Sequence, residues 1–154
     1  MAIYRALVHW QKQIDEAYLD NKYSRGHTWT FEGGVSVPAS SSPHIVPLPY
    51  SIAENVDPEE AFVASLSSCH MLFFLAMAAK KRYIVESYQD NAFGEMAKKE
   101  GKIMMTRVTL VPKIVFSGER IPTALDIEKL HHLAHEQCFI ANSVKTEVVV
   151  EIPE

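Results

Sequence analysis

Two cysteines are the residues in this sequence best suited to covalent chemistry. Cys69 and Cys138 are the only cysteines among the 154 residues, and they stand 69 positions apart. In a cytoplasmic protein such thiols are more often reduced, catalytic or inert than joined in a structural disulfide. Unpaired cysteine also packs in cores as a small apolar residue. The cysteines therefore allow two interpretations, a redox pair or two inert core residues.

A metal site near the end of the chain is a third interpretation. At about 100° per residue, His131, His135 and Cys138 fall on one side of a helix, and imidazole and thiolate are zinc ligands. The set offers only three ligands from one helix, and no CxxC or HExxH motif accompanies it. A histidine pair near a helix C-terminus also makes a favourable contact with the helix dipole. Zinc on the last helix therefore stays an alternative.

Cys69 lies near the middle of the stretch around which the chain is organised, residues 57–82. Asp57 can accept hydrogen bonds from free backbone N–H groups, and Pro58 suits the first turn of a helix. Residues 61–79 carry no formal charge, and the basic run 80–82 suits the carbonyl end of a helix. The pattern predicts one long helix that is enclosed by protein on most sides.

The same helix has the length of a membrane span, because about 20 apolar residues cross a bilayer. Polar residues at 65–70 occupy its midpoint, and the sequence holds no second such segment, so we expect no membrane span. Small side chains recur along it at Ala61, Ala64, Ser65 and Ser68. A stripe of small side chains lets the backbone of another helix come close. It therefore predicts a second helix packed against this one, such as the same helix of a symmetry-related copy of the chain.

The other elements are predicted from alternating and helical apolar patterns. Residues 2–10 are strand-like, residues 23–40 predict a hairpin that turns at Gly33-Gly34, and residues 40–55 predict a loop. Two further strand-like runs, a second helix and a closing strand occupy residues 84–98, 102–116, 122–138 and 144–152. Pro112 predicts a bulge or an edge in its run. This order predicts an α+β fold in one domain, residues 1–154.

Charge and composition exclude one class of function. The net charge is −4, and no basic run is longer than residues 80–82, so the sequence lacks the footprint of a nucleic-acid-binding protein. The N-terminal residues show neither an apolar signal core nor a transit pattern, which predicts a cytoplasmic protein.

A redox role for Cys69 needs a cation that stabilises its thiolate. Cys69 lies about 15 Å beyond the predicted helix start, too far for the helix dipole to do so. Arg25 is the candidate that we favour, because it stands in an otherwise uncharged run before the hairpin. A guanidinium stabilises a thiolate and can orient a peroxide oxygen. The alternative is that Arg25 is a solvated loop residue.

Three motifs together resemble the family of osmotically inducible protein C and the organic hydroperoxide resistance proteins, the OsmC/Ohr family. The motifs are YSRGHTWTFEGG, DPEEAFVASLSSCH and AHEQCFIANSVK, and the resemblance covers nearly the whole length. His70 after the first cysteine and Phe139 after the second depart from the best-known members and place the sequence in a less characterised branch. The role of His70 is left open.

The resemblance implies a thiol-dependent peroxidase that reduces organic hydroperoxides. It implies an intertwined α+β homodimer, with antiparallel sheets packed on a long buried central helix and the sites at the subunit interface. By position, Cys69 would be the peroxidatic thiolate, Cys138 the resolving thiol, Arg25 the arginine near the sulfur, and Glu59 the glutamate that fixes Arg25. A lipoyl-type dithiol would be the reductant, and no cofactor or metal would be required.

The spacing of Glu59 and Cys69 raises a geometric question. Ten residues of straight helix place them about 15 Å apart, which is too far to share a site. Either the helix breaks between them, or Glu59 comes from an antiparallel partner helix. A different class of function, non-enzymatic binding of a small hydrophobic molecule, also fits the apolar residues around Cys69, such as Met71, Phe73 and Phe74.

Overall fold

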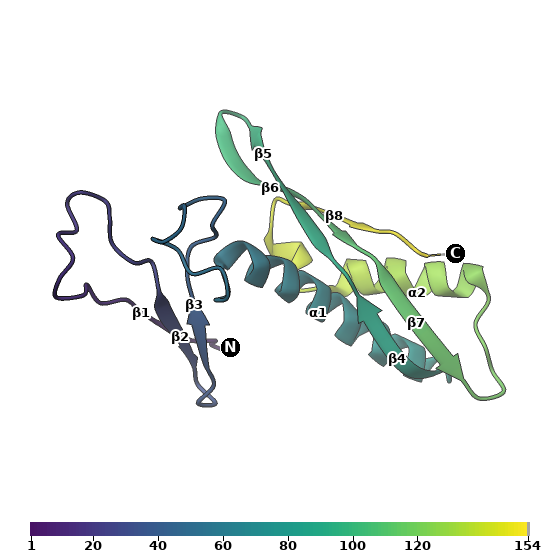
Figure 1. Cartoon of the computed structure of the whole chain (residues 1–154). Coiled ribbons are helices and arrows are strands. Elements are labelled where there is room, and N and C mark those ends of the chain that lie inside the picture. Colours follow the sequence, from purple (N-terminus) through teal and green to yellow (C-terminus); the bar gives the residue numbers. More distant parts are fainter. Residues whose placement is uncertain (154) are drawn as a thin grey trace. The chain divides into compact units, whose positions relative to one another are not determined.

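The computed structural model describes residues 1–153 and divides into two compact units. The first unit is Met1–Ala61 and the second is Phe62–Glu154. Figure 1 shows the elements of each unit, and we describe each unit by itself. Mixed helices and sheets confirm the α+β class.

The first unit contains one antiparallel sheet with the order β1-β2-β3. Its strands are β1 (Ala6–His9), β2 (His27–Phe31) and β3 (Ser36–Ala39). The predicted hairpin is confirmed, and Gly34 in its turn has φ of +95°, a conformation that favours glycine. The predicted first strand, residues 2–10, is shorter in the structure.

The long helix predicted around Cys69 is confirmed as α1 (Pro58–Lys80). The carboxylate of Asp57 accepts the backbone N–H of Glu60 at 2.8 Å, and the N–H of Asp57 donates to the carboxylate of Glu60 at 3.3 Å. This reciprocal pair satisfies two backbone groups that a helix start leaves free. At the other end Arg82 adopts φ of 68°, which stops the helical backbone.

The second unit contains two sheets where the sequence predicted two long strand-like runs. Strands β4 (Ile84–Asp90) and β7 (Pro112–Ser117) form an antiparallel pair. Strands β5 (Phe93–Lys99), β6 (Lys102–Leu110) and β8 (Glu147–Val150) form the other sheet, in the order β5-β6-β8.

Each predicted run is therefore wrong as a single strand, because it crosses from one sheet to the other. Val111 stands between β6 and β7, and its N–H donates to the carboxylate of Asp90 at 2.6 Å. Pro112 has no N–H to donate and begins β7. A side chain thus satisfies the backbone at the point where the chain changes sheets.

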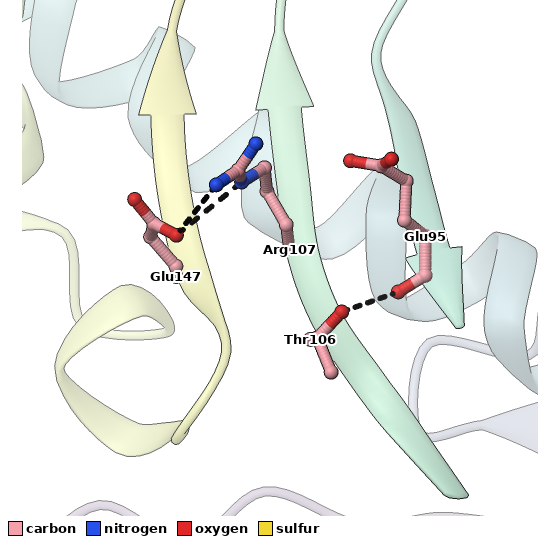
Figure 2. Close-up of polar contacts among 4 residues, drawn as sticks. All are labelled: Glu95, Thr106, Arg107 and Glu147. Atoms are coloured by element: carbon pink, nitrogen blue, oxygen red, sulfur yellow. Dashed lines mark hydrogen bonds and ion pairs between the residues drawn. The ribbon is translucent and has the colours of Figure 1, made fainter. Parts of the chain in front are cut away.

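Side-chain contacts link the three strands of the β5-β6-β8 sheet, as Figure 2 shows. Arg107 on β6 donates from Nε and Nη2 to Glu147 on β8 at 3.3 and 3.2 Å. The hydroxyl of Thr106 donates to the carbonyl of Glu95 on β5 at 3.2 Å. The Arg107–Glu147 pair is exposed, so it contributes at most about 1 kcal/mol. Strand β8 runs parallel to β6, whereas the other pairs are antiparallel as expected.

The predicted last helix is α2 (Ala124–Gln137), followed by a 3-10 turn, η1 (Ala141–Ser143). Thr123 and Asp126 form a capping box at its start. Leu130 and Ala134 of α2 pack against Phe74 and Ala78 of α1. Leu66, on an earlier turn of α1, packs instead with residues of the β5-β6-β8 sheet such as Val108.

One face of α1 is buried and the opposite face is exposed. The buried residues recur every four positions: Leu66, His70, Phe74 and Ala78. The exposed residues have the same spacing: Ala64, Ser68, Leu72 and Ala76. Leu72 is 59% exposed to solvent. By length and composition alone, α1 also passes for a membrane span, but so do core helices of soluble proteins. Ala64 and Ser68 of the small-residue stripe are exposed. The helix that packs on α1 within this chain, α2, contacts Phe74 and Ala78 instead, so it is not the predicted helix on the stripe.

Candidate functional site

The two cysteines come together in the second unit. Cys69 is partly exposed on α1, and Cys138 is 1% exposed at the C-cap of α2. Burial raises the pKa of the Cys138 thiol, and hydrogen bonding to the Cys69 side chain raises that pKa further. The backbone N–H of Ala141 opposes this by donating to the Cys138 sulfur at 3.4 Å. Both thiols are free and within reach of each other.

An aromatic contact holds the turn that carries Cys138 against α1. Phe139 meets Phe73 edge to face, with ring centroids 5.0 Å apart. Phe73 lies one helical turn beyond Cys69, so the two share a face of α1. The contact therefore places the segment after Cys138 beside the helix face that bears Cys69.

Arg25 lies in the first unit, where its side chain is fixed by local contacts. Its guanidinium carbon lies 3.6 Å from the centroid of the Tyr23 ring. Its Nη atoms donate to the carbonyls of Asn21 and Tyr23 and to the side-chain oxygen of Asn21. Arg25 is thus a partly exposed loop residue whose guanidinium is held by neighbouring residues.

Arg25 and Glu59 line the same cavity of about 400 Å³ in the first unit. Aromatic side chains form part of its wall, and Trp10, Tyr18 and Tyr23 pack with centroids 4.7 to 6.0 Å apart. No hydrogen bond or ion pair joins Arg25 to Glu59 within residues 1–153. The cavity combines a cation, a carboxylate and an apolar aromatic surface.

The structure shows whether the helix breaks between Glu59 and Cys69. α1 is one α-helix from Pro58 to Lys80, without a break between Glu59 and Cys69. Ten residues of such a helix rise about 15 Å. Of the two answers open from the sequence, a broken helix is therefore excluded.

A buried histidine pair joins α1 to α2 next to Cys69, and sequence reasoning did not find it. Nε2 of His70 and Nδ1 of His131 are 3.0 Å apart, and the two rings are nearly parallel, at 11°. Their residues are 1% and 3% exposed. The spacing of His70 from Leu66 and Phe74, four residues on each side, was the available signal that it faces the core.

This pair is held uncharged by its surroundings. Burial lowers the pKa of His70 to about 4, and the charge of His135 lowers it further, while Asp90 opposes. Burial, and then His70, lowers the pKa of His131 to about 4. Burial also raises the pKa of Tyr88, on the same strand as Asp90. One hydrogen bond between two neutral imidazoles leaves the outer nitrogens, Nδ1 of His70 and Nε2 of His131, without protein partners.

The zinc alternative finds no support in the arrangement of the last helix. Within residues 1–153 no three His, Cys, Asp or Glu side chains are grouped so that they could hold a metal ion. His131, one of the proposed ligands, uses Nδ1 for its contact with His70.

Comparisons with known proteins give the chain its family. The model of the OsmC-like protein family matches residues 53–153. The solved structure of an OsmC-like protein of unknown function from Vibrio cholerae is 60% identical, with a TM-score of 0.98, and the match covers 99% of this chain and 100% of that one. Among curated proteins, none matches this sequence.

More distant structures share the fold. An OsmC-like protein from Mycoplasma pneumoniae is 13% identical with a TM-score of 0.72, covering 99% of this chain and 96% of that one. The organic hydroperoxide resistance protein of Bacillus subtilis is 16% identical with a TM-score of 0.67, covering 99% and 98%. With the family model matched over most of its length, this chain belongs to the OsmC/Ohr family.

Proposed function

We propose that this protein is a thiol peroxidase that reduces organic hydroperoxides to alcohols. The observation that carries the proposal is a partly exposed Cys69 with the buried thiol of Cys138 within reach. The Cys69 thiolate attacks the distal peroxide oxygen, the O–O bond breaks, and the alkoxide leaves and takes up a proton as the alcohol. Sulfur loses two electrons and becomes a sulfenic acid.

Cys138 then resolves the sulfenic acid. Cys138 is 1% exposed and burial raises the pKa of its thiol, so we assign the attack on the peroxide to the partly exposed Cys69. Condensation forms the Cys69–Cys138 disulfide and releases water. A small dithiol of the lipoyl type reduces the disulfide by two thiol exchanges and regenerates both thiols.

Arg25 and Glu59 complete the site in this proposal. The guanidinium stabilises the thiolate and orients the peroxide, and Glu59 fixes the guanidinium through a charge-assisted hydrogen bond. The cavity that both residues line supports these roles, and the hydrogen bond between them would form in the working assembly. No metal or organic cofactor takes part, and we place the reaction in the cytoplasm.

A homodimer is the proposed working unit. The exposed face of α1 includes Ala64 and Ser68 of the small-residue stripe and continues to Leu72, and a second copy of α1 would cover it. In an antiparallel pair of helices crossing near Ala64, Glu59 of one chain approaches the level of Cys69 of the other. This assembly resolves the separation of about 15 Å within one chain.

Thiol consumption tests the proposed function. Adding cumene hydroperoxide to the reduced protein is expected to remove both thiols, one peroxide per chain, because a single disulfide forms. With dihydrolipoamide present, peroxide should be consumed over many turnovers. Free thiols counted with a disulfide reagent and peroxide followed by absorbance provide the measurements. Unchanged thiols would contradict the proposal and favour the non-enzymatic binding of an apolar molecule around Cys69.

A mixed dimer tests whether Glu59 is shared. One chain carries Cys69→Ser and the other carries Glu59→Ala, with different affinity tags so that only the heterodimer is purified. Sharing places both changes in one site and leaves the second site intact, so we expect about half the activity of the wild-type dimer. Each variant homodimer serves as a control with both sites damaged. A heterodimer as inactive as the Cys69→Ser homodimer would contradict sharing.

A further inference from the structure

One residue, Asn21, accepts two of the hydrogen bonds that the Arg25 guanidinium donates. Nη2 of Arg25 donates to the side-chain oxygen of Asn21 at 2.9 Å, and Nη1 donates to the carbonyl oxygen of Asn21 at 3.0 Å. Nη1 also donates to the carbonyl of Tyr23, whose ring lies against the guanidinium. Asn21 is exposed, so packing in a core does not explain why an asparagine stands here.

The backbone conformation of Asn21 restricts which residues can take its place. Asn21 has φ of 65°, in the left-handed region that glycine, asparagine and aspartate adopt most readily. Its N–H donates to the carbonyl of Tyr18 at 2.9 Å, which closes the turn. Of the residue types suited to this conformation, only asparagine adds an uncharged side-chain oxygen to the backbone carbonyl.

All three oxygens that accept hydrogen bonds from the Arg25 guanidinium are uncharged. Two are backbone carbonyls and one belongs to an amide. Among residues 1–153, no ion pair includes Arg25. The guanidinium is therefore held without a neutralising carboxylate, and its full positive charge is the property that stabilises a thiolate.

These bonds leave part of the guanidinium for other partners. Of its five N–H donors, the three bonds use both hydrogens of Nη1 and one of Nη2. Within residues 1–153, the N–H of Nε and the second N–H of Nη2 make no hydrogen bond. Two such N–H groups can bind a carboxylate through parallel bonds. Glu59 lines the same cavity as Arg25 and is the carboxylate of the proposed site.

We propose that Asn21 is a positioning residue of the peroxidase site. It holds the Arg25 guanidinium through uncharged oxygens, so that the remaining N–H groups of Arg25 are left for Glu59 and the peroxide. This inference rests on the proposed function, and in particular on the role of Arg25 beside the Cys69 thiolate.

Asn21→Gly removes the side-chain oxygen and keeps the left-handed backbone with its carbonyl. We expect kcat/KM for cumene hydroperoxide to fall about tenfold, because a hydrogen bond to a charged group is lost. The pH profile of Cys69 alkylation by iodoacetamide, measured with Cys138→Ser so that one thiol remains, should move to higher pH. Unchanged kcat/KM together with an unchanged alkylation profile would overturn the proposal.

Combining Asn21→Gly with Arg25→Ala separates positioning from a purely structural role. If Asn21 acts through Arg25, Asn21→Gly lowers kcat/KM in the wild type and has no further effect in Arg25→Ala. Additive losses in an active enzyme would show that Asn21 acts otherwise, and they would overturn this inference alone. A wild type that consumes no peroxide, or an Arg25→Ala variant with full activity, would instead contradict the proposed function and the inference with it.

Asn21→Asp tests the need for an uncharged oxygen, and it also tests the position if the glycine variant does not fold. Aspartate keeps the conformation and the acceptor but sets a negative charge against the guanidinium. We expect kcat/KM to fall severalfold and the alkylation profile to move to higher pH. Lys22→Ala, at the next exposed position, lowers the net charge by the same amount and is the matched control. Equal losses in both variants, or no loss in Asn21→Asp, would overturn the proposal.

Discussion

Cys69→Ser is expected to abolish peroxide reduction, with a loss on the order of a thousandfold or more in kcat/KM. A serine hydroxyl is not ionised at neutral pH and is a far weaker nucleophile than a thiolate. The measurement is consumption of cumene hydroperoxide with dihydrolipoamide as the reductant.

Two further variants separate the chemistry of Cys69 from its surroundings. Cys138→Ser should consume one peroxide per chain and then stop as a sulfenic acid, which a dimedone adduct reveals in the intact mass. Ser87→Ala, at an exposed position of β4 outside the proposed site, is the control and should retain activity. If Cys69→Ser keeps most of its activity, the attacking sulfur is not Cys69.

Acidification from pH 6.5 to pH 4 is expected to lower the free energy of unfolding by about 2 to 4 kcal/mol through His70 and His131. Each has its pKa lowered to about 4 in the folded protein, mainly by burial. As the pH falls below 6.5, the two histidines take up protons in the unfolded chain but not in the folded chain. The free energy of unfolding therefore decreases between pH 6.5 and about pH 4, below which both states are protonated. The two losses do not simply add, because a charge on one ring opposes a charge on the other.

Urea denaturation at a series of pH values measures this loss. The double variant His70→Leu, His131→Leu removes both titrating groups and should flatten the dependence between pH 6.5 and 4.5. His44→Gln, at an exposed position in the first unit, is the control and should leave the dependence unchanged. The same pH dependence in wild type and double variant would assign the loss to other groups.

The helices were the most predictable part of the fold. Asp57, Pro58 and the basic run after Ala79 mark the ends of α1 through local hydrogen bonds and the helix dipole, which are properties of neighbouring residues. The hairpin followed from Gly33-Gly34 for the same reason. Signals of this kind need no knowledge of the rest of the chain.

The strand crossings were not predictable, because they depend on contacts between distant residues. The sequence pattern predicts β4 and β5 as one strand. In the structure the chain changes sheets after Asp90, whose carboxylate accepts the N–H of Val111, a residue 21 positions further along the chain. Pro112 predicted an irregularity but not a change of sheet. Apolar alternation gives strand faces and does not say which sheet a strand joins.

The contacts within the candidate site could not be predicted from local sequence either. The proximity of Cys69 and Cys138 followed only from the family resemblance, since their separation in sequence carries no distance. The His70–His131 contact joins residues 61 positions apart on two helices, and neither residue type predicts the core. Sequence reasoning placed His131 in a zinc set, whereas its packing partner is another histidine.

The exposed face of α1 also bears on how much protein the cell must make. If a second copy covers Leu72 and its neighbours, folding and association form a single equilibrium, and the folded fraction rises with total concentration. Dilution would then act as a denaturant. At low concentration, halving the amount of protein would then lower the total activity by more than half. Doubling the amount would raise it by more than twofold.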